Sequence, residues 1–187
     1  MPEVLAALEA GRPLEDIPGL ALPRGDAVWR TAERAYMPPP DELPFPRRDL
    51  VRHLRQRYYY LFHQPVATLK TTWGCWYRCN FCFTWGITGG VPYARSPESI
   101  AAELAQIEAD DVYIVDDIFL VNTHRLARLA ELLRANRIRK HYLVYGRADF
   151  IAEHEEAVAE WADLGLRAVF VGLEATTDPE LDAMHKD

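Results

Sequence analysis

Residues 112–145 read VYIVDDIFLVNTHRLARLAELLRANRIRKHYLVY: a short β-branched run, an amphipathic stretch and a second apolar run. The first run (112–116) and the last (141–145) have the length and composition of buried strands. Between them, Leu126, Leu129 and Leu133 recur at helical spacing and predict a helix over 122–135. Two buried strands joined by one helix predict a parallel βαβ unit.

The same alternation continues on both sides of this unit. Strands are predicted at 66–72 and 167–173, and helices at 153–164 and after Ser96, whose hydroxyl and following proline are typical of a helix start. The fold class is therefore α/β, a partial (β/α) barrel of the TIM type with about four βα units. Four strands do not close a barrel. Either another chain supplies the rest or this is a piece of a longer protein, and we favour the second.

Residues 1–65 are distinguished by ten of the thirteen prolines. Such a stretch predicts a largely extended linker with short helices, here over 3–10 and 47–61. We therefore expect two parts, a proline-rich linker at 1–65 and the α/β part at 66–187. The arginines of 47–61 are typical either of a site for an anionic partner, such as membrane headgroups or a neighbouring domain, or of a solvated helix face.

The net charge of -7 argues against a general nucleic-acid-binding protein, which needs a positive surface. The sequence contains neither an apolar run of the roughly 20 residues that span a bilayer nor a signal peptide at its start. We therefore expect a cytoplasmic protein, with peripheral association at the inner membrane as the alternative that the arginines leave open.

All three cysteines, Cys75, Cys79 and Cys82, lie in one window directly after the strand at 66–72, with the spacing CxxxCxxC. Thiolates this close are typical ligands of a soft metal centre. On a cubane [4Fe–4S] cluster they leave one iron without a protein ligand, and such an open position is where chemistry occurs. Zinc is the alternative, but it needs a histidine as fourth ligand, and the nearest, His63, precedes the strand.

Four further polar side chains follow predicted strands: Asp116 and Asp117 after the second, Arg147 after the third and Glu174 after the fourth. The carboxyl ends of parallel strands meet at one edge, where sites of α/β folds are built. Two structural alternatives stay open. The aspartates are also suited to a helix N-cap, and Arg147 and Glu174 to an ion pair with each other.

The run Cys75, Cys79, Phe81 and Cys82 resembles the signature of the radical SAM superfamily, CxxxCxΦC with an aromatic residue at Φ, and the resemblance extends over 66–187. It implies a radical SAM barrel with a [4Fe–4S] cluster on the three cysteines and S-adenosylmethionine (SAM) on the open iron. One-electron reduction, from a donor such as flavodoxin or ferredoxin, then cleaves SAM to a radical that abstracts hydrogen from an unactivated carbon.

The same resemblance implies roles for the other residues. Phe81 is expected beside the adenine, and Asp116 and Asp117 where family members contact the SAM amino group, although the commonest motif there, Gly-Gly-Glu, is absent. Arg147 is expected to pair with the SAM carboxylate, a bidentate task suited to a guanidinium. Glu174 is expected to reach the ribose or the amino group.

The segments LEDIPGLA (14–21) and DELPFPRR (41–48) are similar to the linker that joins a cobalamin-binding domain to the barrel in the B12-dependent class. Within that class, the segments that together look most like hopanoid C-3 methylases are TTWGC (71–75) with RCNFC (78–82), ITGGVPYARSPESI (87–100), VYIVDDIFLVN (112–122) and YLVYGRADF (142–150). This implies cobalamin as a further cofactor and methylation of an unactivated carbon on a small-molecule or lipid substrate. Cyclase-type chemistry of the same class, or an inactive truncated fragment, are the alternatives.

Overall fold

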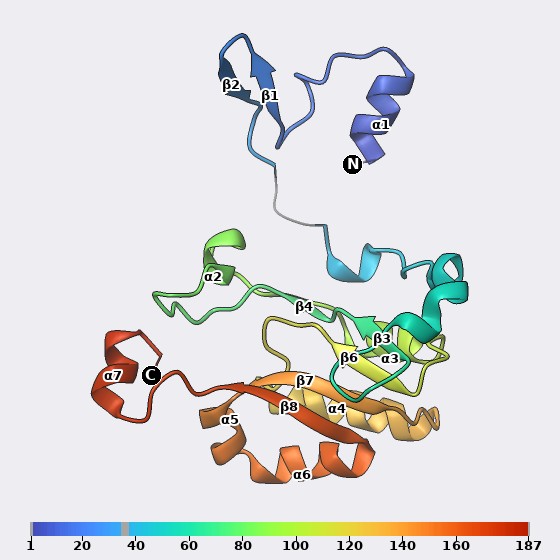
Figure 1. Ribbon diagram of the computed structural model, residues 1–187, viewed down its shortest axis with the longest axis vertical. Helices are drawn as coiled ribbons and strands as arrows, with labels where there is room; N and C mark the ends of the chain where they lie inside the picture. Colours follow the sequence, from blue (N-terminus) through green and yellow to red (C-terminus); the bar gives the residue numbers. More distant parts are fainter. Residues whose placement is uncertain (1, 35–37, 187) are drawn as a thin grey trace. The chain divides into compact units, whose positions relative to one another are not determined.

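The computed structural model describes residues 2–34 and 38–186, which fall into two compact units, Met1–Pro38 and Pro39–Asp187 (Figure 1). The boundary lies within the three consecutive prolines at 38–40, whereas the sequence predicted a division near residue 65. Residues 39–65 belong to the unit that contains the sheet. The proline-rich region is therefore divided between the two units.

The first unit contains helix α1 (Pro2–Glu9), close to the prediction, and a hairpin of strands β1 (Ala21–Arg24) and β2 (Ala27–Arg30). The strands are antiparallel, with Ala21 opposite Arg30. Sequence analysis missed this hairpin because the strands are short and β1 contains a proline. Its signal was the two-residue Gly-Asp turn, in which Gly25 has φ +62°.

The second unit contains a four-stranded sheet in the order β3-β6-β7-β8. All three neighbouring pairs are parallel, which confirms the predicted α/β class. Because the strands are parallel, their carboxyl ends share one edge of the sheet. The strands are β3 (Val66–Leu69), β6 (Asp111–Ile114), β7 (His141–Arg147) and β8 (Leu166–Gly172).

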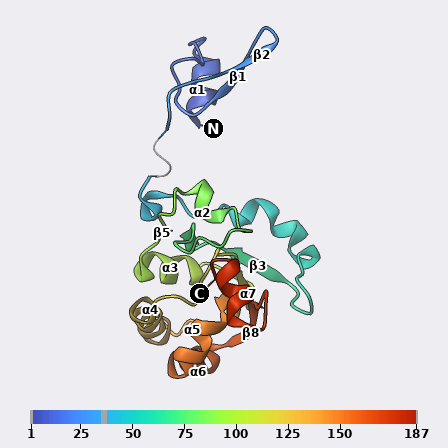
Figure 2. The ribbon, with the colours of Figure 1, turned by 90° about the vertical axis from the view of Figure 1, so that its left-hand side faces the viewer.

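Helices α3 (Pro97–Leu104), α4 (Thr123–Ala135) and α6 (Glu155–Leu164) follow one another along one face of the sheet (Figure 2). Leu129 of α4 and Trp161 of α6 are fully buried there against strand residues such as Ile114. Helix α3 begins where the sequence places a cap, since the Ser96 hydroxyl accepts the Ser99 N–H at 3.1 Å. This face holds the hydrophobic core.

The opposite face of the sheet carries a row of aromatic side chains. Tyr60 stacks on Tyr113 with ring centroids 4.6 Å apart, Tyr113 contacts Tyr145, and Tyr145 contacts Phe170. The hydroxyls of Tyr113 and Tyr145 are 2.6 Å apart, and Phe170 is 57% exposed. In a barrel this face is the interior, so the chain presents an aromatic inner wall.

Three predicted elements differ in extent from those observed. The helix expected over 47–61 is a 3-10 helix, η2 (Arg48–Arg57), without buried residues. The strand expected over 66–72 ends at Leu69, and the helix expected over 153–164 is interrupted at His154, which separates α5 from α6. The remaining elements are η1 (Pro40–Glu42), β4 (Thr72–Trp73), α2 (Thr84–Ile87), β5 (Tyr93–Ala94), α5 (Ala148–Glu153) and α7 (Asp178–Ala183).

Most arginines of the η2 segment form ion pairs within their own unit. Arg47 pairs with Asp49, Arg48 with Glu103, and Arg52 and Arg55 with Glu108. Each of these four arginines thus has a carboxylate partner within its unit, and Arg52 and Arg55 share Glu108. Within residues 2–34 and 38–186, none of the helices has both the length and the apolar character needed to cross a bilayer.

Candidate metal centre and cofactor site

The three cysteines lie on the loop that leaves the carboxyl end of β3. A small antiparallel ribbon of β4 and β5 frames this loop, with Thr72 opposite Ala94. Cys79 is buried, Cys75 and Cys82 are half-buried, and all three are free thiols. Burial, followed by the charges of Cys82 and Cys79, raises the pKa of the Cys75 thiol. A cationic centre between the thiols would relieve that repulsion.

Hydrogen bonds fix the course of the cysteine loop. The indole N–H of Trp85 donates to the Cys79 carbonyl at 3.1 Å. Asn80 donates to the end of α7, through its backbone N–H to the Met184 carbonyl at 3.0 Å and through its amide to the Ala183 carbonyl at 2.9 Å. The loop therefore has a defined backbone between its second and third cysteine.

Within the part of the chain that the structure describes, no group of three or more His, Cys, Asp or Glu side chains is arranged to hold a metal ion. The zinc alternative, one ion on three thiolates and a histidine, thus has no counterpart among these residues. A cubane cluster presents a different iron to each cysteine, so it does not require the three sulfurs to converge on one point.

Two observations bear on whether the loop fits a cluster. Gly74, the residue before Cys75, has φ +84°, and a Cβ there would lie 2.7 Å from the Thr88 Cγ2 atom. The Thr88 hydroxyl is buried and has no hydrogen-bond partner among the described residues. A buried hydroxyl without a partner is costly, and this one lies beside Gly74, the residue before Cys75, where an acceptor atom of a bound group would satisfy it. The residues present fit such a group.

Asp116 and Asp117 follow β6 and face the start of the cysteine loop. Asp116 is 3% exposed, whereas the side chain of Asp117 is partly exposed. The N-cap alternative is wrong, because Asn122 caps α4 by accepting the Arg125 N–H at 2.9 Å. Burial raises the pKa of Asp116, against the hydrogen bonds that it receives. A direct contact between Asp116 and SAM would require those bonds to break.

Arg147 ends β7 and is held from two sides. Its Nε and Nη2 atoms donate to the Asp149 carboxylate at 2.9 and 2.7 Å. Its guanidinium lies over the ring of Tyr77, on the cysteine loop, 3.8 Å from the ring centroid. Arg147 thus contacts the cysteine loop directly, in an orientation that Asp149 fixes.

Glu174 follows β8 with φ +61°, a conformation that is uncommon outside glycine. Its carboxylate lies 3.2 Å from the ammonium of Lys186, and that ammonium also donates to the Gly172 carbonyl at 2.6 Å. The Arg147–Glu174 ion pair, left open as a structural alternative, is therefore not the arrangement found in residues 38–186. A cavity of about 480 Å³ lies between the ends of β7 and β8 and α7. Phe81, on the loop, is 53% exposed.

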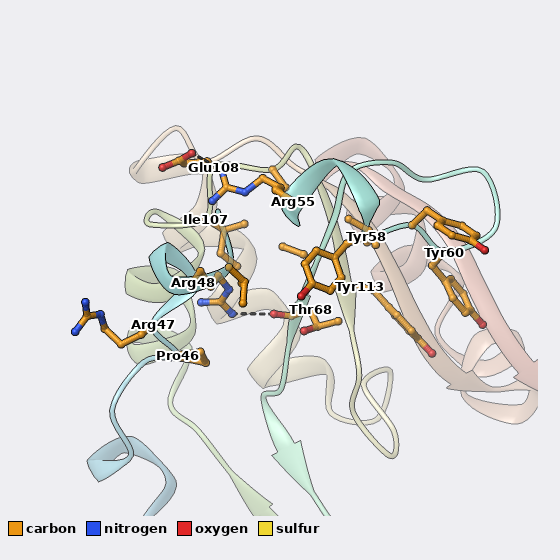
Figure 3. A pocket seen from close by; sticks show the side chains of 15 residues that line it. Pro46, Arg47, Arg48, Arg55, Tyr58, Tyr60, Thr68, Ile107, Glu108 and Tyr113 are labelled. Carbon is orange, nitrogen blue, oxygen red and sulfur yellow. Dashed lines mark hydrogen bonds and ion pairs between the residues drawn. The ribbon is translucent and has the colours of Figure 1, made fainter. Parts of the chain in front are cut away.

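A second cavity, of about 510 Å³, lies away from the cysteines (Figure 3). It is bounded by η2, by Val66–Thr68 of β3 and by the tyrosines that precede β3. Arg48 crosses it to donate to the Thr68 carbonyl at 2.8 Å. The arginines that line it, Arg47, Arg48 and Arg55, are each paired with a carboxylate. The residues that line the cavity, all of which the structure describes, therefore include no arginine without a counter-charge beside it.

Several residues of the site were not singled out from the sequence. Asp149 is recognisable from the Arg-x-Asp spacing after a strand, and Thr71 from its place before the cysteine loop. Thr88 and Asn80 carried no signal, because their importance depends on contacts with Gly74 and α7 that only the folded chain makes.

A parallel α/β sheet with a three-cysteine loop and charged side chains at its carboxyl edge defines a class, the cofactor-dependent barrel enzymes. The sequence pattern of the Radical SAM superfamily matches residues 69–187. The chain belongs to this superfamily, whose members use a [4Fe–4S] cluster and SAM.

Similar proteins include the hopanoid C-3 methylase of Methylococcus capsulatus, 27% identical over 99% of this chain and 35% of that protein. Among solved structures, the cobalamin-dependent SAM radical enzyme OxsB, with aqua-cobalamin and SAM bound, has a TM-score of 0.78 at 19% identity, over 99% of this chain and 28% of OxsB. The radical SAM methyltransferase TsrM of Kitasatospora setae has a TM-score of 0.60 at 22% identity, over 96% of this chain and 36% of TsrM. The chain thus spans about a third of the length of these proteins.

Proposed function

We propose that Cys75, Cys79 and Cys82 each bind one iron of a [4Fe–4S] cluster and that SAM binds beside them at the same sheet edge. The observation that carries this proposal is the anchored three-cysteine loop in direct contact with Arg147 through Tyr77. The thiolates that would hold the cluster and the guanidinium that would bind the SAM carboxylate then lie next to each other. SAM bound to the open iron requires this closeness.

The remaining residues bind and orient. Asp149 holds the Arg147 guanidinium through its Nε and Nη2 atoms, so the orientation of the guanidinium is fixed before it meets the SAM carboxylate. Glu174 accepts a hydrogen bond from the ribose or the amino group, in exchange for its contact with Lys186. Phe81 lies by the adenine, where an exposed aromatic ring is covered on binding.

When bound, the reduced cluster and SAM supply reductive cleavage of SAM, and with it hydrogen abstraction from an unactivated carbon. The electron comes from a small redox protein such as flavodoxin or ferredoxin. The chain's own contribution is to hold the three thiolates and to orient SAM. The aromatic row of Tyr113, Tyr145 and Phe170 provides an apolar wall below the cysteine edge.

We further propose that the chain is part of a cobalamin-dependent C-methyltransferase acting on a triterpenoid lipid of the hopanoid type. The support is that the likeness to the hopanoid C-3 methylase covers 99% of the chain, and therefore also the residues before 69, which the superfamily pattern does not match. An apolar substrate also suits the exposed aromatic ring of Phe170 on the inner face.

The test is anaerobic reconstitution with iron and sulfide, followed by SAM and dithionite, with mass-spectrometric detection of 5′-deoxyadenosine. We expect product from the wild-type chain and none from Cys79→Ala. Adding cobalamin that carries no methyl group, SAM with a deuterated methyl group and a hopanoid lipid should transfer deuterium from SAM, through the cobalamin, to the lipid.

Two results would count against the proposal separately. A chain that carries the cluster but forms no 5′-deoxyadenosine contradicts the SAM site. A chain that cleaves SAM but transfers no deuterium to the lipid contradicts the methylation of that substrate and leaves the superfamily chemistry intact.

A further inference from the structure

Asp116 uses both carboxylate oxygens to hold the chain that leads out of β3. Its Oδ1 atom accepts the backbone N–H of Thr71 at 2.6 Å and that of Thr72 at 3.0 Å. Its Oδ2 atom accepts the Thr71 hydroxyl. These bonds replace the sheet pairing that β3 would otherwise continue, which explains why the strand ends at Leu69 rather than at residue 72.

Asp117 holds the next part of the same segment. Its Oδ2 atom accepts the Gly74 N–H at 2.7 Å and lies 3.3 Å from the Lys70 ammonium. Lys70 in turn donates to the Val115 carbonyl at 2.8 Å. The two adjacent aspartates therefore hold the segment 70–74 along its length. Asp116 binds Thr71 and Thr72, and Asp117 binds Lys70 and Gly74, the residue before Cys75.

The carboxylate of Asp116 is buried close to the half-buried guanidinium of Arg125. The Arg125 Nη2 atom donates to the Thr71 hydroxyl at 3.0 Å and to the Thr71 carbonyl at 3.3 Å. A buried carboxylate is expensive unless it is paired and hydrogen-bonded, and here both oxygens accept hydrogen bonds from Thr71 and Thr72. Asp116 is therefore built to hold backbone.

Gly74 is fixed from its other side as well. Thr88, beyond the third cysteine, packs where a side chain of residue 74 would lie, with its Cβ atom 2.9 Å from that position. The two ends of the cysteine loop thus meet at Gly74, between Asp117 and Thr88. The aspartates determine where this meeting point lies relative to the sheet edge.

We propose that Asp116 and Asp117 are positioning residues for the cysteine loop, Asp116 acting through Thr71 and Thr72 and Asp117 through Gly74. This replaces the direct contact with the SAM amino group that the sequence suggested for them. As far as it concerns a cluster, the inference rests on the proposed function, because the loop's placement determines where the three thiolates lie.

The first experiment uses the metal-free chain and is therefore independent of the cluster. Hydrogen exchange of amides 71–74, followed by mass spectrometry, should be at least tenfold faster in Asp116→Ala than in wild type. Asp116→Asn keeps one acceptor oxygen and should restore most of the protection. Asp163→Ala, an exposed carboxylate on α6, is the matched control and should change nothing in this segment.

The second experiment compares iron content and SAM affinity after reconstitution. We expect Asp116→Ala and Asp117→Ala to retain less than half of the wild-type iron, and the SAM dissociation constant per bound cluster to change less than threefold. If Asp116→Ala does not fold, Thr71→Val, which removes the hydroxyl donated to Asp116, should still lower protection of the segment.

Unchanged exchange in these variants would overturn the inference, whatever the cluster does. Normal iron content with a SAM dissociation constant raised tenfold or more would also overturn it, because the aspartates would then be SAM ligands. If the variants exchange faster as expected but the wild-type chain binds no cluster, the proposed function is contradicted and the positioning of the loop remains supported.

Discussion

Gly74 is the residue at which the extended chain after β3 becomes the cysteine loop. Its φ of +84° and the contact with Thr88 both exclude a side chain. Asp117 accepts its N–H, so the residue is restrained by backbone conformation, packing and hydrogen bonding together. Cys75 follows directly, and its position depends on these three restraints.

Gly74→Ala should therefore lower both stability and iron loading. The left-handed conformation alone costs about 1–2 kcal/mol for alanine, and the new Cβ meets Thr88 at 2.7 Å from Cγ2. Gly89→Ala is the matched control, because Gly89 has φ +65° with no atom near its Cβ position. Thermal unfolding of the metal-free chain should show a larger fall in Tm for Gly74→Ala, and Thr88→Ala should partly restore it. Equal effects of the two glycine variants would contradict the contact.

At the scale of elements, Glu103 of α3 joins three segments. It is 1% exposed and pairs with Arg95, just after β5, and with Arg48 of η2 at 2.5 Å. Arg95 also donates to the Lys70 carbonyl at 3.3 Å. The buried carboxylate of Glu103 thus connects η2, through Arg48, and the end of β5, through Arg95, to helix α3.

Replacing Glu103 by glutamine leaves two arginines without their counter-charge. Removing one member of a buried ion pair costs roughly 3–5 kcal/mol. We expect Glu103→Gln to lower the free energy of unfolding, measured by urea titration, by an amount in that range. Glu131→Gln, which breaks an exposed pair with Arg128, should change it by less than about 1 kcal/mol. A small change for Glu103 as well would show that the pairs do not fasten these segments.

The elements that the sequence predicted best are those whose apolar pattern and burial agree. The helix α4 and the strand β7 were found because Leu126, Leu129 and Leu133 face the core and 141–145 is continuously apolar. The end of β3 was misplaced because Asp116, more than 40 residues away, takes the N–H groups of Thr71 and Thr72. Local sequence does not encode such a competitor.

The predicted site residues follow the same division. The cysteines and Glu174 come after the ends of β3 and β8, and Arg147 ends β7, so the predicted strand order brings them to one edge of the sheet. Their partners Tyr77, Asp149 and Lys186 were not foreseen, because each pairing depends on loop conformation. For the same reason the ion pairs of η2 with Glu103 and Glu108 were not anticipated.

At the scale of the whole molecule, the four parallel strands gather the cysteine loop, Asp117, Arg147 and Glu174 at one edge, and the aromatic row lies on the inner face below. The chain covers about a third of its similar proteins. The cysteine loop lies wholly within the part described, so binding of a cluster can be tested on this chain directly.

The most direct test of the account is the iron and sulfide content of the anaerobically reconstituted chain, together with its electron paramagnetic resonance after reduction. A [4Fe–4S] cluster predicts about four irons and four sulfides per chain and a reduced-cluster spectrum that changes when SAM is added. Cys75→Ala, Cys79→Ala and Cys82→Ala should each lose it. A wild-type chain that binds a single zinc ion, or whose iron content is unaffected by these substitutions, would contradict the central claim.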